Sequence, residues 1–434
     1  MPYRTLAPLL GILLANALAA TLIVAIVPLV AVEQFGATVA QALLLETAYY
    51  STKLLTAPLL GHLSDRYGRR PLMLLSQAGT SAGFLCFLSA FFVQGEMTLF
   101  GLGHPIHQGL FLLYLGKLLD GVTAGNSTVA RAYVADLVPR ARYSQVMGWL
   151  AATLGVAFIL GPALSGLFIA YQSLTAPFAI AAVLTLLAWG AAFILLPESL
   201  PRAARQGRGG AIRPVRTLHQ LRQQTAFLRL ALTGAGATLS FGALFAAATL
   251  YIRAQFFPAG SDPATIGAFV SYLLTAMGLI LALSQLLLNH WLVSRWGEFR
   301  VMRLSQLLMV AGFVLVPLLT DRHLFALLML PLTAAHGLLE PNVQAQIAQL
   351  DQSGQGQRLG LFQALNSLAD LLGPIWVALL FARFEPAAIW WLAALIMGST
   401  LLLYWGKWDK QPSTQLLAEL ATSAAQNDNP HHAR

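Results

Sequence analysis

A small set of ionisable residues falls inside the long apolar segments of this sequence. They are Glu46, Lys53, Lys117, Asp120, Arg131, Glu340 and Asp370, together with His336. An ionisable side chain at bilayer depth is costly unless it is paired or hydrated, so such residues are functional candidates by default. The chemistry that they offer is proton exchange and the binding of a charged or polar solute.

Spacing orders these candidates. Lys117 and Asp120 stand at positions i and i+3 of one expected helix, so they share a face and are predicted to form an ion pair. Our leading hypothesis makes Asp120 the carboxylate that binds proton or substrate, with Lys117 as its partner. The alternative is a static pair that only makes this helix tolerable in lipid. Glu46 and Lys53 are seven residues apart, which places them on one face at a rise of about 10 Å.

Three further candidates lie in the second half of the chain. Glu340 precedes Pro341, and the bend expected at that proline suits a gate or a site wall, although an inward-facing, capped carboxylate fits equally well. Asp370 lies one turn before a Gly-Pro pair and carries the same two interpretations. His336 could carry protons because its ordinary pKa is near neutral, or it could be a packed helix residue. Asn16 is the central polar residue of the first apolar run.

The elements that must position these residues are membrane helices. The chain has 434 residues, of which 57% are hydrophobic and only 10% charged. A soluble domain carries about 25% charged residues, so soluble domains are excluded. One bilayer crossing needs about 20 apolar residues. Twelve runs of that length lie at about 6–32, 40–60, 71–93, 109–133, 144–170, 176–196, 227–252, 264–293, 301–319, 324–347, 359–381 and 387–406.

The basic residues predict the orientation of these twelve spans. Of the 26 Lys and Arg, only Arg253, Arg322 and Arg383 fall in loops on the side opposite the termini. Basic loops stay in the cytoplasm, so both termini are predicted to be cytoplasmic in a cell inner membrane. The net charge of +9 is therefore a topology signal, and nucleic-acid binding has no support. A single cysteine, Cys86, permits no internal disulfide.

The chain divides into two related halves. We expect a six-helix half at 1–196, a basic cytoplasmic linker at 197–226, a second six-helix half at 227–407 and a polar cytoplasmic tail at 408–434. Three pairs of matching patterns support a duplication. Gly148 with Gly161-Pro162 matches Gly360 with Gly373-Pro374, and Gly121 with Asn126 matches Gly337 with Asn342. The third match is between Arg66-Tyr67-Gly68 and Arg295-Trp296-Gly297. Such an architecture places a solute site near the midplane between halves that rock to alternate access.

The loop between spans 2 and 3 reads Gly61-His62-Leu63-Ser64-Asp65-Arg66-Tyr67-Gly68-Arg69-Arg70-Pro71. It resembles the signature loop of the major facilitator superfamily, G-x-L-x-D-R-x-G-R-[KR], at every defined position. The resemblance implies an all-α fold of twelve helices in two pseudo-symmetric halves. It also implies a gating loop, made of Gly61, Asp65, Arg66, Gly68, Arg69 and Arg70, that latches the cytoplasmic side in one access state. Asp136 is implied to pair with the loop arginines.

Span 5 refines the resemblance. Its small residues have nearly the spacing G-x8-G-x3-G-P-x2-G-G, which is similar to the motif of proton-coupled drug antiporters; they are Gly148, Ala157, Gly161, Pro162, Ser165 and Gly166. A seam for helix packing alone is the other interpretation. The segment Ala132-Tyr133-Val134-Ala135-Asp136 resembles the tetracycline/proton antiporter group. The chain departs from drug exporters in span 1, where Asn16 replaces an acidic residue, and in span 4, where Lys117 and Asp120 stand at motif positions.

These observations predict a monomeric proton-coupled transporter that exports small amphiphilic or aromatic compounds. A permease of the same fold for an organic anion or a metallophore is the first alternative, because Lys53 and Lys117 could attract an anion. A membrane-embedded sensor or enzyme is the second. No metal-spaced His/Cys cluster, nucleophile elbow or phosphate-binding loop occurs in the sequence. We therefore expect no enzymatic activity and no cofactor, and a proton gradient rather than ATP as the energy source.

Overall fold

The computed structural model describes residues 3–98, 105–124, 126–138, 140–171, 173–200, 225–258, 260–350 and 355–403. The expected linker and tail lie almost wholly outside these residues. The first half holds α1 (Tyr3–Val24), α2 (Val27–Glu33), α3 (Val39–Tyr67), α4 (Arg69–Ser89), a short antiparallel hairpin of β1 (Glu96–Thr98) and β2 (Pro105–His107), α5 (Gln108–Thr123), α6 (Asn126–Leu137), α7 (Arg140–Ala170) and α8 (Ala176–Leu195).

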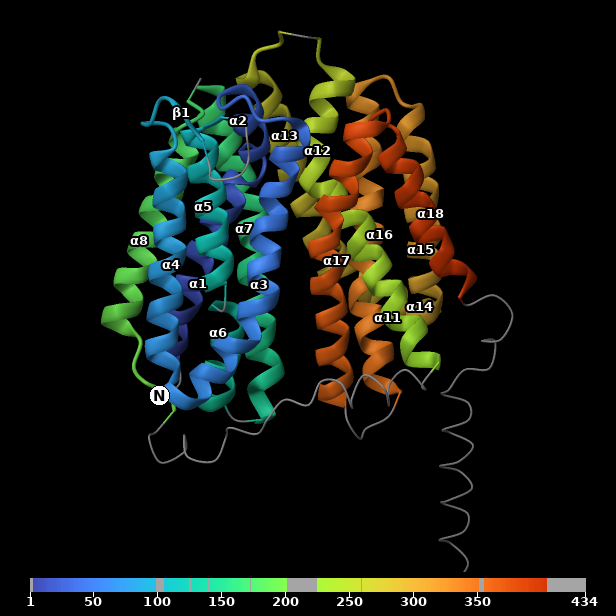
Figure 1. The fold of residues 1–434 in the computed structure, drawn as a ribbon. Helices are drawn as coiled ribbons and strands as arrows, with labels where there is room; N and C mark the ends of the chain where they lie inside the picture. The colour runs from blue at the N-terminus through green and yellow to red at the C-terminus, as the bar shows by residue number, and fades with distance from the viewer. Residues whose placement is uncertain are drawn as a thin grey trace, which may run out of the picture.

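The second half holds a similar series of helices. They are α11 (Thr225–Ala237), the π-helical η1 (Thr238–Gly242), α12 (Ala243–Phe256), α13 (Pro263–Leu283), the π-helical η2 (Ser284–Leu288), α14 (Asn289–Trp296), α15 (Glu298–Leu315), the 3₁₀ turn η3 (Val316–Leu318), α16 (Arg322–Gln349), α17 (Gln355–Arg383) and α18 (Ala388–Leu402). Figure 1 shows the two bundles side by side, with α8 and α18 on their outer flanks.

Each of the twelve expected apolar runs contains at least one helix. Among the described residues, eight helices are long and apolar enough to cross a membrane, and a ninth crossing is a pair, Thr225–Gly242 and Ala247–Phe256, bent by 48° at the break that follows η1. Three runs do not meet that test for visible reasons. α5 and α18 have only 16 and 15 residues, and α3 is polar over much of its length because it carries Glu46, Lys53 and the start of the gating loop.

Several spans expected to be continuous are interrupted. Span 1 breaks between α1 and α2, where Pro28 stands in the first turn of α2 and supplies no backbone N–H. The Ala25 carbonyl in that turn accepts a hydrogen bond from the Thr249 hydroxyl of α12, at 2.8 Å. Span 4 breaks between α5 and α6, and spans 7 and 8 contain π-helical segments, which are often found at functional sites. The break in span 1 thus supplies a link between the halves.

Local signals explain where several helices begin. Thr38 caps α3 by accepting from the Gln41 backbone N–H while the Gln41 side chain accepts from Thr38, a complete capping box. Asp321 caps α16 through the backbone N–H groups of His323 and Leu324. Gly68 and Gly297 join α3 to α4 and α14 to α15 with φ of 109° and 79°, a region that favours glycine.

The two halves pack together mainly at one end of the molecule. We call this the hairpin end, because β1 lies there (Figure 1). The opposite end, where α3 ends and α4 begins, we call the Gly68 end. Near the hairpin end one apolar cluster contains residues of both halves, such as Ile26, Ile169, Val270 and Met277. Towards the Gly68 end, one cluster of described residues belongs to the first half alone and another to the second half alone. The halves are therefore closed against each other at the hairpin end.

Candidate functional site

A buried ion pair joins α3 and α5 inside the first half. The Lys117 ammonium donates to the Glu46 carboxylate at 2.5 Å, and the two side chains are only 11% and 14% exposed. Their desolvation makes each of them costly without the other, so the pair is a strong positional constraint between the two helices.

The predicted pair of Lys117 with Asp120 is wrong. Asp120 instead accepts a hydrogen bond from the Thr80 hydroxyl of α4, at 3.0 Å. The reason is the close approach of α4 and α5: a Cβ on Gly83 would lie 2.8 Å from the Gly116 carbonyl oxygen. That contact brings Thr80 to Asp120, while Lys117 reaches Glu46 on the opposite neighbour, α3. Sharing a helix face did not determine which neighbouring helix each side chain would meet.

Lys53 lies two turns along α3 from Glu46 and is close to two tyrosine rings. Its ammonium lies 5.4 Å from the centroid of the Tyr49 ring and 5.6 Å from that of Tyr50. The Lys117 ammonium also lies over Tyr49, at 5.8 Å. Lys53 is within electrostatic range of both Asp120 and Asp370, so its charge acts on carboxylates of both halves.

A small cavity lies at the interface between α3 and α17. Its volume is about 50 Å³, and its polar lining consists of Glu46 and Tyr50 from the first half and Asp370 from the second. Because one water needs roughly 10–15 Å³ by this measure, the cavity has room for a few waters but not for a drug-sized solute. Glu46, Lys53, Lys117, Asp120 and Asp370 together form what we call the charged cluster.

The other ionisable or polar candidates lie apart from this cluster or on its edge. Glu340 accepts from the Gln344 side chain one turn along α16, at 3.1 Å, and lies within electrostatic range of Asp370. His336 stacks on Phe241 of η1, with ring centroids 4.3 Å apart. Asn16 bonds to Gln77 of α4, at 2.6 Å.

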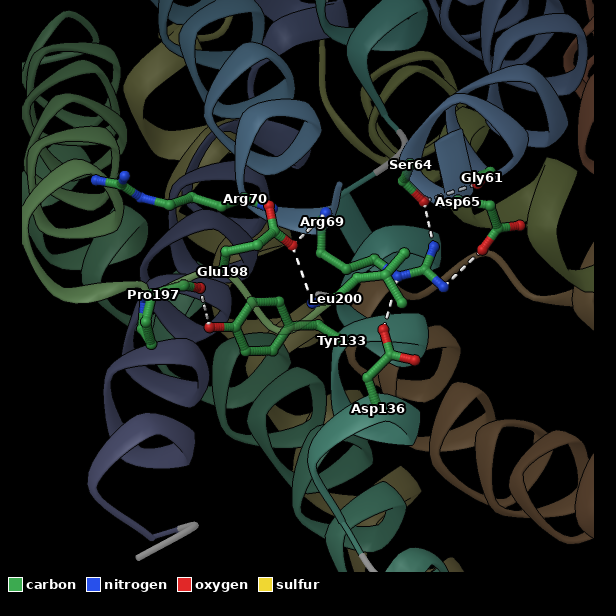
Figure 2. A network of polar contacts seen from close by, with 10 residues as sticks. All are labelled: Gly61, Ser64, Asp65, Arg69, Arg70, Tyr133, Asp136, Pro197, Glu198 and Leu200. Atoms are coloured by element: carbon green, nitrogen blue, oxygen red, sulfur yellow. Dashed lines mark hydrogen bonds and ion pairs between the residues drawn. The ribbon is translucent and has the colours of Figure 1, made fainter. Parts of the chain in front are cut away.

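The gating loop forms a polar network at the Gly68 end, drawn in Figure 2. Arg69 is its centre and is only 4% exposed. Its guanidinium contacts Asp65 at 2.6 Å, donates to Asp136 at 2.9 Å and donates to the Ser64 hydroxyl at 2.5 Å. These partners lie on α3 and α6, so a single arginine ties three helices of the first half together. We call Ser64, Asp65, Arg69 and Asp136 the gating cluster.

The other arginines of the loop behave differently. Arg66 is exposed, and its guanidinium lies over the Tyr67 ring at 5.5 Å. Arg70 turns outward to the end of α8, where it donates to the Phe193 carbonyl at 2.8 Å.

Sequence reasoning missed Glu198, which follows α8 at the root of the expected linker. Its carboxylate accepts from the backbone N–H groups of Arg69 at 2.8 Å, Arg70 at 3.3 Å and Leu200 at 3.0 Å (Figure 2). A carboxylate at a helix N-terminus is favourable, so Glu198 anchors this segment to the start of α4. The available signal was an acid directly after a proline at the end of a span.

The small residues of span 5 pack in two directions along α7. A Cβ on Gly161 would overlap Thr21 of α1, and one on Gly166 would lie 3.0 Å from Ser271 Cβ of α13 in the other half. The Ala157 carbonyl accepts from the Thr21 hydroxyl at 2.8 Å, and Ser165 is fully buried. A Cβ on Gly148 would meet open space in this arrangement.

Comparison with known proteins identifies this architecture. The Major Facilitator Superfamily model matches residues 9–350, and a second match covers residues 259–426. The chain belongs to the major facilitator superfamily. The predicted fold class, an all-α membrane protein with the major facilitator fold, is confirmed, and the protein is a multi-pass membrane transporter rather than an enzyme.

Relatives within this superfamily cover most of the chain. Tetracycline resistance protein class G of Vibrio anguillarum is 30% identical over 363 residues, which are 82% of this chain and 84% of that protein. Tetracycline resistance protein class C of Escherichia coli is 28% identical over 385 residues, 84% of this chain and 87% of that protein. The crystal structure of a D-xylose–proton symporter shares the fold, with a TM-score of 0.69, 14% identity, and coverage of 93% of this chain and 97% of that one. These relatives confirm the predicted resemblance to the drug antiporter branch.

Proposed function

We propose that this protein is a proton-coupled secondary transporter that exports small amphiphilic or aromatic compounds by alternating access. The observation that carries the proposal is the charged cluster. The Glu46–Lys117 pair and Asp120 lie among the helices of the first half, and Glu46 shares a cavity between the halves with Asp370 of the second half. Ionisable groups at that depth mark proton and substrate pathways. The relatives named as tetracycline resistance proteins support export of aromatic compounds.

The packing of the halves supports alternating access. Closure is seen at the hairpin end, where Arg253 of α12 pairs with Glu33 of α2 across the halves. The positive-inside pattern makes the Gly68 end cytoplasmic. Under that orientation the arrangement is inward-facing, and the transport cycle alternates it with an arrangement closed at the Gly68 end. The gating cluster lies at the end that would have to close.

Asp120 remains our leading proton carrier, now with Thr80 as its direct hydrogen-bond partner. The charge of Lys53 acts on both Asp120 and Asp370 of the other half, so we propose that protonation of Asp120 strengthens the attraction between Lys53 and Asp370. Proton binding in one half is thereby connected to an interaction between the halves. This is the connection that a proton-coupled transporter requires, because a ligand shifts a conformational equilibrium only through differential interactions with the two states.

The test is proton-coupled flux in proteoliposomes with tetracycline as the probe. Asp120→Asn should abolish uptake driven by a pH gradient while leaving folding, measured by thermal unfolding, intact. Glu385→Gln is the matched control, because Glu385 is an exposed carboxylate just after the end of α17, and this variant should transport normally. Unchanged coupling in Asp120→Asn would remove Asp120 from the mechanism, and absence of any gradient-driven flux in the wild type would refute the proposed function.

A permease for an organic anion or metallophore is the second candidate. The observation that favours it is Lys53, whose ammonium lies over two tyrosine rings where a planar anion could bind. Proton movement separates the two candidates. An exporter in exchange for protons acidifies the compartment that loses substrate, whereas a symporter of anion and proton alkalinises it. A pH-sensitive dye inside the vesicles measures the sign.

A further inference from the structure

Another cavity lies at the hairpin end, where the loop between α12 and α13 meets the end of α2 (Figure 1). Its volume is about 220 Å³, and its charged lining consists of Glu33 of the first half and Arg253 of the second. Phe257 and Ile266 are among the apolar residues of its wall. Sites for drug-sized ligands have volumes of about 300–1,000 Å³, so this cavity suits a smaller compound of one or two rings.

Arg253 is the group of this cavity that can bind an anion. It is one of only three basic residues in the predicted loops on the side opposite the termini, so the topology rule does not account for it. Its Nε forms an ion pair with the Glu33 carboxylate, and 37% of its side chain is exposed. The two terminal nitrogens have no hydrogen-bond partner among the described residues. A guanidinium binds a carboxylate through two parallel hydrogen bonds, so these nitrogens can hold a second acid.

An aromatic wall stands beside this guanidinium. Phe257 comes directly after α12, four residues beyond Arg253. The guanidinium of Arg322 lies over its ring, 5.3 Å from the centroid, and Phe269 of α13 packs against it with ring centroids 6.0 Å apart. The cavity therefore combines a cationic donor with a fixed aromatic surface, which are the two features that recognise an aromatic carboxylate.

One carboxylate competes for Arg253 in the protein itself, and that is Glu33. Two other acids stand in the loops at this end, Asp262 and Asp321, and each accepts backbone N–H groups at the start of a helix, α13 and α16 respectively. Their charges are thus held by helix N-termini.

We propose that this cavity binds a small aromatic carboxylate, whose acid group takes the terminal nitrogens of Arg253 while its ring lies against Phe257. The bound anion competes with Glu33 for the same guanidinium. It therefore weakens the ion pair that joins the two halves at the hairpin end. Because coupling is reciprocal, the anion also binds more tightly when that end is open. This effect on the closure rests on the proposed alternating access, whereas the binding itself does not.

A plain lock between the halves explains only part of this geometry. Such a lock requires the contact between Arg253 and Glu33 and nothing more. It does not account for an aromatic-lined cavity that opens beside the remaining nitrogens of the guanidinium. The two roles also differ in what they predict for the loss of Glu33. If the ion pair only held the cavity together, ligand binding would be lost, whereas removal of a competitor strengthens it.

The test is a fluorescence titration of 1-naphthoate on the full-length protein in detergent micelles, with neutral 1-naphthylmethanol as the matched ligand. Arg253→Gln should weaken naphthoate binding by about tenfold or more, because hydrogen bonds between charged groups are lost. Glu33→Gln should strengthen binding several-fold. Ala254→Phe fills the cavity from an exposed position on its wall and should block binding with the ion pair in place. Arg383→Gln removes another exposed arginine of the same side, at the end of α17, and should bind like the wild type.

Four results would overturn the binding site. They are equal affinity for naphthoate and naphthylmethanol, unchanged binding in Arg253→Gln, loss of binding in Glu33→Gln, and loss of binding in Lys53→Met, which would place the anion in the charged cluster. Thermal unfolding checks that each variant is folded. If Arg253→Gln does not fold, Ala254→Phe and the comparison of the two ligands still decide the question.

The effect on the closure is measured by thiol labelling of engineered cysteines at the hairpin end. Naphthoate should increase the labelling rate in the otherwise wild-type protein and leave it unchanged in Arg253→Gln. Unchanged labelling in the wild type at saturating naphthoate would overturn the competition with Glu33. Absence of gradient-driven tetracycline flux would refute the proposed function instead, and the titration would still decide the binding site.

Discussion

The ion pair between Lys117 and Glu46 leads to the sharpest prediction, because it replaces the pair that sequence spacing favoured. We consider Lys117→Met, Glu46→Gln and Asp120→Asn, alone and in pairs with Lys117→Met. Both partners of the observed pair are largely buried, with exposures of 11% and 14%. Removing one of them leaves an uncompensated charge in the interior, whereas removing both does not.

The expected magnitudes separate the two pairings. Breaking a buried ion pair from one side costs about 3–5 kcal/mol. Ordinary interhelical hydrogen bonds in membranes contribute about 0.6 kcal/mol on average, so the pair should stand out clearly. Lys117→Met and Glu46→Gln should each destabilise by several kcal/mol, and their double variant should recover most of the loss. The coupling between Lys117 and Asp120, which do not touch, should be about 1 kcal/mol or less.

A double-mutant cycle on unfolding in detergent micelles measures both couplings. Each cycle needs the free energy of unfolding of the wild type, two single variants and one double variant under identical conditions. A coupling between Lys117 and Asp120 that equals or exceeds the coupling between Lys117 and Glu46 would refute the reasoning. It would show that the pair predicted from helix spacing, and not the interhelical one, dominates in the folded protein.

Two other predictions concern packing and capping. A Cβ on Gly278 would lie 2.6 Å from the Phe158 carbonyl oxygen of the other half. Gly278→Ala should therefore disfavour the arrangement closed at the hairpin end by about 1–3 kcal/mol. That energy corresponds to a shift of about 5–150-fold in the ratio of the two access states. Thiol labelling of engineered cysteines at the hairpin end should then increase, whereas Gly190→Ala, with open space around it, should leave labelling unchanged. The backbone N–H of Leu324 holds the pKa of the Asp321 carboxyl below its usual 3.8, so its stabilisation is present above pH 3.8 and is lost as the pH falls through the lowered pKa. The difference in Tm between the wild type and Asp321→Asn should therefore shrink in acid, and a difference that does not depend on pH would contradict this explanation.

The gating loop shows which structural features a local sequence pattern can predict and which it cannot. Its glycines, Asp65 and its arginines lie consecutively in the chain, so their types and spacing predicted both the superfamily and a polar network near Asp136. The network places Arg69 at the centre and turns Arg66 and Arg70 outward, which spacing alone could not distinguish. Glu198 was missed because it joins Arg69 across 129 residues, and nothing near it in the sequence marks its partner.

The charged cluster likewise separates what the sequence determined from what the packing of helices decided. Hydropathy is a local property, so the sequence by itself determined that Glu46, Lys117 and Asp120 lie within expected membrane spans and that such a chain belongs in a membrane. Which of these side chains meet depended on the rotation and depth of neighbouring helices. Those are decided by close contacts such as that between Gly83 and Gly116, which bring distant parts of the chain together. The tertiary structure alone therefore decided that Lys117 binds Glu46, that Asp120 binds Thr80, and that Glu46 shares a cavity with Asp370 of the other half.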